Sequence, residues 1–232
     1  MSTSSQSFPK APQSPDVLGE LLHSLSQPLT GLLCSLELSL QLPVDLSTEQ
    51  VAEQQQANVS VALQQTEKVI SMIQLMREYL DAEQPGPVAF SSALAPAMRS
   101  VIEGLSSIAA VRGVRLRLVG TCLATLPVPE PRLRLALQYL ITTLIQAEPV
   151  GGKVLLLLGE GPTGAVLRAE GERGCRGQKP GTTSPQTASR RARIAIASRV
   201  LESAGASLVF GGGEVDPTGF VLRIPRPFAI RD

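Results

Sequence analysis

The chain has 232 residues, of which 43% are hydrophobic and 18% charged, and its formal net charge is +1 at pH 7. This composition supports a substantial folded core and excludes a globally disordered chain. The near-zero net charge gives no electrostatic basis for nucleic acid or an anionic membrane as the main partner. No uninterrupted apolar run reaches the roughly 18 residues that a membrane-spanning helix needs.

Residues 1–13 are polar and rich in Ser, Pro and Gln. They lack the apolar region of a signal peptide, so we expect a short disordered leader. The three cysteines, Cys34, Cys122 and Cys175, are odd in number and widely spaced. They predict neither a metal site nor a disulfide framework, and they fit a reducing compartment. These features predict a soluble, cytoplasmic protein.

The first long helix is predicted to begin at Ser14–Asp16. This start supplies an N-cap hydroxyl, a proline at the first helical position and an acid in the first turn. Leucines then recur at spacings of three and four residues as far as about Leu42, which indicates an amphipathic helix. Pro43 ends it, because proline lacks the amide hydrogen that a continuing helix needs.

A second helix is predicted from Ser47 to about Asp81. Ser47 and Gln50 fit a capping box, and apolar residues follow at helical spacing. Residues 14–83 therefore predict an antiparallel helical hairpin joined by a short loop. A hairpin cannot bury its apolar stripes alone, so we expect a homodimer in which two hairpins form a four-helix bundle.

Residues 84–88 are rich in Pro and Gly and predict a linker to a second domain, residues 89–232. There the periodicity predicts alternating helices and strands, with Gly205 ending the last helix. The expected helices are 91–110, 131–147 and 192–204, the expected strands are 114–119, 154–158, 165–169, 208–210 and 219–224, and a mobile loop is expected over 172–188. This order predicts an α+β sandwich with helices on one face of a mixed sheet.

His23 is the single histidine of the chain. The helical period places it away from the leucine stripe, on the side that carries Gln27 and Thr30. An imidazole has an ordinary pKa near 6.5, so it is largely neutral at pH 7 and can attack phosphorus through a nitrogen lone pair. Pro28 inside the same helix costs about 3 kcal/mol or more, which demands a reason. The alternative is an ordinary exposed histidine without a chemical role.

The segment from His23 to Thr30 resembles the phospho-acceptor box of sensor histidine kinases. The hairpin resembles their dimerisation and histidine-phosphotransfer domain. The resemblance continues in order with residues 90–119 for the first helix and strand of the ATP-binding domain, 130–134 for the start of the asparagine-box helix, 194–208 for the helix after the ATP lid, and 219–225 for the closing strand. It implies a degenerate histidine-kinase-type ATPase sandwich behind the hairpin.

The nucleotide-binding positions of the family are altered in this sequence. Where the family has its magnesium-binding asparagines, this sequence has Tyr139 and Thr143, and where the family has the following lysine, it has Gln146. Glu170–Gly174 stand in place of the Asp-x-Gly-x-Gly box, and Arg190–Arg193 in place of the second glycine box. ATP binding needs an acid for adenine, oxygen ligands for magnesium, and bare backbone for the phosphates. We therefore expect no nucleotide cofactor and no metal at Tyr139, Thr143, Glu170 and Arg193.

A histidine followed by a degenerate ATP domain resembles the dimeric histidine phosphotransferases. The resemblance implies that His23 relays a phosphoryl group between aspartates of response-regulator receiver domains, which supply the magnesium. Gln27, Thr30 and Ser24 would be its neighbours, and a sensor kinase is a further candidate partner. Two alternatives stay open. One is a non-catalytic pseudokinase that docks and regulates a two-component partner, and the other is a divergent but active sensor histidine kinase.

Overall fold

The computed structural model describes residues 15–41, 48–83, 91–172, 185–211 and 217–226. Contacts between residues divide the chain into two compact units, Met1–Val69 and Ile70–Asp232. The predicted leader, the linker, most of the predicted loop over 172–188, and the stop and cap signals at Pro43 and Ser47 lie outside the described residues.

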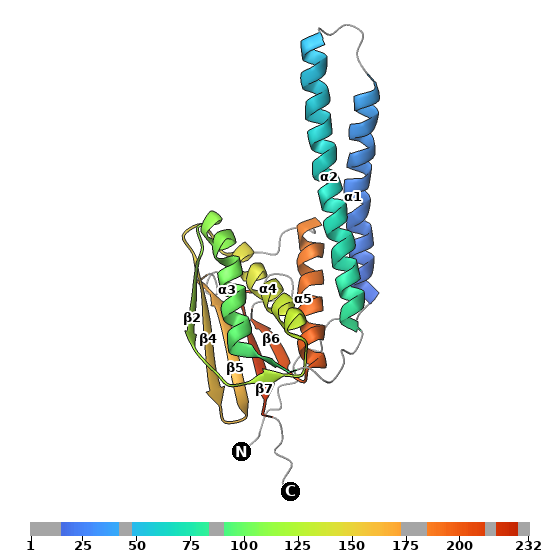
Figure 1. The fold of residues 1–232 in the computed structure, drawn as a ribbon. Helices are drawn as coiled ribbons and strands as arrows, with labels where there is room; N and C mark the ends of the chain where they lie inside the picture. Colours follow the sequence, from blue (N-terminus) through green and yellow to red (C-terminus); the bar gives the residue numbers. More distant parts are fainter. Residues whose placement is uncertain (1–14, 42–47, 84–90, 173–184, 212–216, 227–232) are drawn as a thin grey trace, which may run out of the picture. The chain divides into compact units, whose positions relative to one another are not determined.

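Two long helices make up the N-terminal hairpin: α1 (Pro15–Leu40) and α2 (Thr48–Glu83), as the sequence predicts (Figure 1). α1 continues through Pro28. Because proline has no amide hydrogen, the carbonyl of Ser24 loses its helical donor there. Within the first unit the helices approach closely at Gly31, where an added Cβ would lie 3.4 Å from the side chain of Gln65.

The second unit contains a five-stranded sheet in the order β2-β4-β5-β7-β6. Strand β2 pairs in parallel with β4, and the other neighbours pair antiparallel. Three helices cover one face of this sheet (Figure 1). The strands are β2 (Arg115–Gly120), β4 (Lys153–Gly161), β5 (Gly164–Gly171), β6 (Ser207–Gly211) and β7 (Gly219–Pro225), and the helices are α3 (Leu94–Val111), α4 (Glu130–Ala147) and α5 (Pro185–Ser203). The predicted mixed sheet with helices on one face is therefore confirmed.

Two elements differ from the sequence expectation. The short strands β1 (Ser92–Ala93) and β3 (Thr125–Leu126) pair antiparallel, so α3 begins later than expected. Two-residue strands carry no hydrophobic period, which is why the pattern could not reveal them. Helix α5 begins at Pro185, inside the predicted loop. Its first turns are rich in Ser, Thr and Arg and lack an apolar stripe.

The core of the second unit is aliphatic. Leu133, Leu137 and Ile141 on α4 are fully buried, as are Leu156 and Leu167 on the sheet. Among the described helices, only α3 is long and apolar enough to cross a membrane. α3 contacts α4 and β2 with its buried face, however, so it is a core helix of this domain.

Candidate functional site

His23 lies exposed on α1, as its place in the helical period predicted. Gln27 and Thr30 are also exposed, and a helix brings both to the side of His23. The Thr30 hydroxyl donates to the Ser26 carbonyl at 2.9 Å. Ser24 is only 8% exposed, so the structure does not place it with His23 on the solvent-facing side. The exposed candidates are therefore His23, Gln27 and Thr30.

Glu20 is a further neighbour of His23 that the motif reading missed. It lies three residues earlier on α1 and is half-buried. Residues three apart in a helix are close on its surface, so the spacing alone could have identified this carboxylate. In the motif of the family the acid follows the histidine, at the position of Ser24. The motif therefore gives no signal for an acid in the preceding turn.

Two of the altered nucleotide positions, Tyr139 and Arg193, belong to a second cluster that lies entirely within the unit Ile70–Asp232. Tyr139 of α4 donates its hydroxyl hydrogen to the carboxylate of Glu78 in the last turns of α2. The guanidinium of Arg193 on α5 lies over the Tyr139 ring, 5.8 Å from its centre. Burial, and then the hydrogen bond to the Glu78 carboxylate, hold the pKa of Tyr139 well above its ordinary value. Tyr139 therefore stays a neutral hydrogen-bond donor.

Two more contacts join the same elements. Arg199 of α5 lies over the ring of Tyr79, 4.2 Å from its centre, and Tyr79 is 2% exposed. On α4, the guanidinium of Arg132 donates to the carbonyl of Asp81 at 2.6 Å. The last turns of α2 are thus contacted by one tyrosine and two arginines of the α/β domain, Tyr139, Arg132 and Arg199. Sequence reasoning missed Glu78 and Tyr79, because no local signal connects them to partners so distant in the chain.

Thr143 and Glu170 do not complete a ligand set with Tyr139. Thr143 is 1% exposed, and its hydroxyl donates to the Tyr139 carbonyl at 2.8 Å. Glu170 lies on β5 and pairs with Arg168. Side chains alternate between the faces of a strand, and the neighbouring Ala169 is buried on the helix side. Glu170 therefore lies on the open side of the sheet, away from α4.

The side chains at the altered positions differ from the ligands that magnesium-bound ATP needs. The hydroxyls of Tyr139 and Thr143 already donate within the protein, and the nearby Arg193 is a cation where a second one would have to bind. Magnesium prefers carboxylate, amide and water oxygens. The described part of the chain holds no group of three His, Cys, Asp or Glu side chains that could bind a metal ion.

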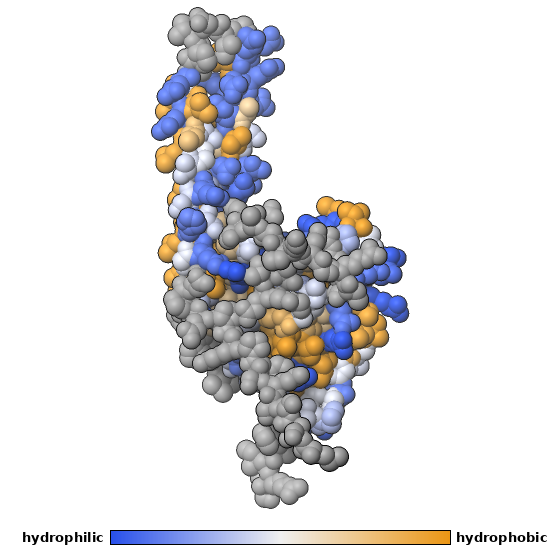
Figure 2. Space-filling view, turned by 180° about the vertical axis from the view of Figure 1, so that it is seen from behind, coloured by the Kyte–Doolittle hydropathy of each residue, from blue (hydrophilic) through white to orange (hydrophobic). Residues whose placement is uncertain are grey.

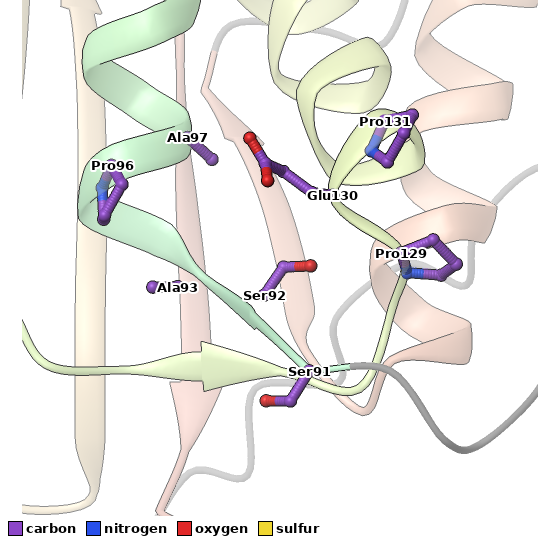
Figure 3. Close-up of a pocket in the computed structure, with 8 residues that line it drawn as sticks. All are labelled: Ser91, Ser92, Ala93, Pro96, Ala97, Pro129, Glu130 and Pro131. Atoms are coloured by element: carbon purple, nitrogen blue, oxygen red, sulfur yellow. The ribbon is translucent and has the colours of Figure 1, made fainter.

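A shallow pocket of about 440 Å³ lies where the N-termini of α3 and α4 approach each other (Figure 3). Its lining includes Ser92, Pro96, Pro129 and the charged residue Glu130. The Ser92 hydroxyl donates to the carbonyl of Val128 at 2.6 Å, so this polar group is already used by the fold. None of the predicted site residues lines the pocket, and we assign no function to it.

The sequence matches no protein-family model and no curated protein. The structure is similar to solved histidine kinases. The histidine kinase AdeS of Acinetobacter baumannii matches with a TM-score of 0.62 and 14% identity, over 88% of this chain and 97% of AdeS. The histidine kinase ThkA, solved in complex with the response regulator TrrA, matches with a TM-score of 0.63 and 12% identity, over 94% of this chain and 63% of that one. The chain thus has a histidine-kinase-like fold: a helical hairpin followed by an ATPase-type α/β domain.

Proposed function

We propose that this protein is a histidine phosphotransfer protein. His23 accepts a phosphoryl group from the aspartate of one response-regulator receiver domain and passes it to another. The observation that carries the proposal is the exposed His23 on the hairpin of a histidine-kinase-like fold whose nucleotide-site positions are occupied by internal contacts. That ThkA was solved with a response regulator supports a receiver as the class of partner.

The transfer needs little from this chain. A ring nitrogen of His23 attacks the phosphorus of the phosphoaspartate in line, the new N–P bond forms, and the acyl P–O bond breaks to leave the aspartate as a carboxylate. The second step reverses the first on another receiver. The receiver supplies magnesium and most of the charge stabilisation, while this chain supplies a positioned imidazole and a docking surface. Gln27 and Thr30 would line that surface.

We propose further that the protein does not use ATP. Tyr139 occupies a magnesium-ligand position of the family, and its hydroxyl is hydrogen-bonded to Glu78. A nucleotide would have to break this bond and approach with its metal beside Arg193. Phosphate could pair with arginine, but the adenine acid and the metal ligands would still be missing.

The hairpin supports a homodimer. Inside the first unit the buried side chains include Val17 and Leu21 near the start of α1, whereas further along the hairpin they are small or polar, such as Ser35, Asn58 and Ala62. Most large apolar side chains of the hairpin lie on the outside, along one stripe of each helix; those at least two fifths exposed include Leu29, Leu33, Leu36, Leu40, Val59 and Leu63. Figure 2 shows hydrophobic residues exposed along the hairpin. A second copy would cover both stripes in a four-helix bundle.

We place the protein in the cytoplasm, the reducing compartment that receiver domains share. Two of its cysteines support this assignment. Cys34 is a free thiol exposed on α1, and Cys122 is a free thiol buried in the α/β domain. In an oxidising compartment an exposed free thiol would be a liability.

Phosphoryl transfer is tested with a receiver domain labelled on its aspartate with radioactive phosphate. The labelled receiver is mixed with the wild-type protein, with His23→Ala, and with Ser26→Ala as a matched control on the same helix. We expect acid-labile label on the wild type and on Ser26→Ala, and none on His23→Ala. If the receiver binds but wild-type protein gains no label, the protein is instead a non-catalytic docking protein.

Calorimetric titration with magnesium-ATP tests the second part of the proposal. We expect no binding heat at millimolar nucleotide. Saturable, magnesium-dependent binding would show that the altered positions still hold ATP, and it would favour a divergent but active kinase.

A further inference from the structure

We propose that the open face of the five-stranded sheet is a second interaction surface, which binds an acidic partner protein. The three helices of the domain pack on the opposite face of the sheet (Figure 1). Figure 2 shows the open side, where apolar residues form a patch flanked by hydrophilic ones. This surface belongs to the α/β domain alone and does not depend on the role of His23.

A row of mainly apolar side chains, interrupted by Arg168 on β5, crosses the sheet. The pairing register places Val119 beside Leu157, Leu157 beside Arg168, and Arg168 beside Val221, which pairs with Val209. These side chains point away from the helices, because they alternate with buried core residues along each strand. Val119 is 41% exposed, Leu157 37% and Val209 45%. Apolar side chains that are contiguous and rimmed by polar ones are typical of protein interaction sites.

The rim of this surface is basic. Arg115 and Arg117 on β2, Lys153 on β4 and Arg223 on β7 are all exposed on the open face. The acids of this face in the described part of the chain are paired, Glu170 with Arg168 and Glu172 with Lys153. Among the described residues, Arg115, Arg117 and Arg223 make no ion pair. The surface therefore carries unpaired positive charge on a chain whose net charge is only +1.

The chemistry of the face selects a protein as its occupant. Proteins that bind single-stranded nucleic acid on a sheet stack the bases on aromatic side chains. The phenylalanines of the described strands do not offer this: Phe220 is 2% exposed, and Phe210 alternates onto the helix side. Membrane-surface binding uses aromatic or leucine side chains that protrude beyond their neighbours, whereas most of these apolar residues are short valines beside longer arginines. A protein face with carboxylates around an apolar centre matches both features.

The test uses the full-length protein and a fluorescein-labelled peptide of alternating glutamate and valine as the acidic probe. Fluorescence anisotropy is measured for the wild type, for Arg115→Glu/Arg117→Glu/Arg223→Glu, and for a control with the same charge change on the helical side of the domain. The control variant is Arg99→Glu/Arg112→Glu/Arg134→Glu, at three residues that are also exposed.

We expect the wild type and the control variant to bind the peptide alike, and the sheet variant to bind at least about tenfold more weakly. Binding should also weaken as salt is added, because the charges are exposed. An equal loss in both variants, or no binding to the wild type, would overturn the proposal. Vesicles containing phosphatidylserine are titrated in parallel, and tighter binding to them that the sheet variant loses would assign the face to a membrane instead.

Discussion

The contact between Tyr139 and Glu78 gives the sharpest test of the altered nucleotide site. The substitution Tyr139→Phe removes one hydroxyl and keeps the ring, so the stacking of Arg193 and the packing of α4 are preserved. What changes is the half-buried carboxylate of Glu78, which loses its donor within the unit Ile70–Asp232. The free energy of unfolding of this unit should fall, because water can hydrate the carboxylate only in part.

The size of the effect follows from the charge of the acceptor. A hydrogen bond to a charged group contributes about 1.5–3 kcal/mol, roughly twice as much as a neutral one. The Glu78 side chain is half-buried, which favours the lower half of this range. Urea lowers the free energy of unfolding by about 1–3 kcal/mol per molar for small proteins. The urea concentration at the midpoint of unfolding should therefore fall by about 1 M.

Urea unfolding followed by circular dichroism measures this change for Tyr139→Phe, Glu78→Gln and the double variant. If the two side chains act through one bond, the double variant should lose much less than the sum of the single losses. Arg77→Gln is the matched control on α2. Its exposed pairing with Asp81 at 4.0 Å should contribute less than about 0.5 kcal/mol. A Tyr139→Phe loss as small as that of the control would refute the reasoning.

Three further substitutions and one titration follow from other parts of the structure. Gly120→Ala should cost at least about 2 kcal/mol in thermal unfolding, because Gly120 has a φ of +87° and an added Cβ would lie 2.0 Å from a backbone oxygen of β4. Gly104→Ala, in an open position on α3, should instead raise stability by about 0.5–1 kcal/mol. Leu33→Glu should turn a dimer into a monomer in sedimentation velocity, and a wild type that is already monomeric would contradict the proposed bundle. The raised pKa of Tyr139 means that the folded state holds the phenol proton more strongly than the unfolded state does. The protonated phenol should therefore contribute fully to the free energy of unfolding below pH about 10, and this contribution should fall above that pH. The fall should be absent in Tyr139→Phe.

The helices and most strands were predictable, because their signals are local. The leucine spacing of α1, the alternation in β2 and the glycine at the end of α5 each lie within a few residues of the element they define. Gly205 has the positive φ of +79° that the helix end requires. Helix α5 starts earlier than expected because its first turns carry Ser, Thr and Arg without an apolar stripe, so the hydrophobic period gave no signal for them.

The candidate site was predictable only in part, for the same physical reason. The sequence places His23, Gln27 and Thr30 on one side of a helix, because a helix has a fixed period. It identifies Tyr139 as a departure from the family pattern. It contains no information on the contact that Tyr139 makes, because Glu78 and Tyr139 are 61 residues apart in the chain. Only the packing of α4 and α5 against the end of α2 makes them neighbours.

The two halves of the proposed function support each other through these contacts. An active kinase must let its ATP-binding domain reach the histidine, so strong internal contacts at the nucleotide position would oppose its reaction. A phosphotransfer protein has no such step, because its phosphate arrives on another protein. The Tyr139–Glu78 bond, the two stacked arginines and the Arg132–Asp81 bond would then cost nothing in function and would stabilise the domain. If the protein does not use ATP, as proposed, a tyrosine is tolerated at this position, and its bond to Glu78 opposes nucleotide binding there.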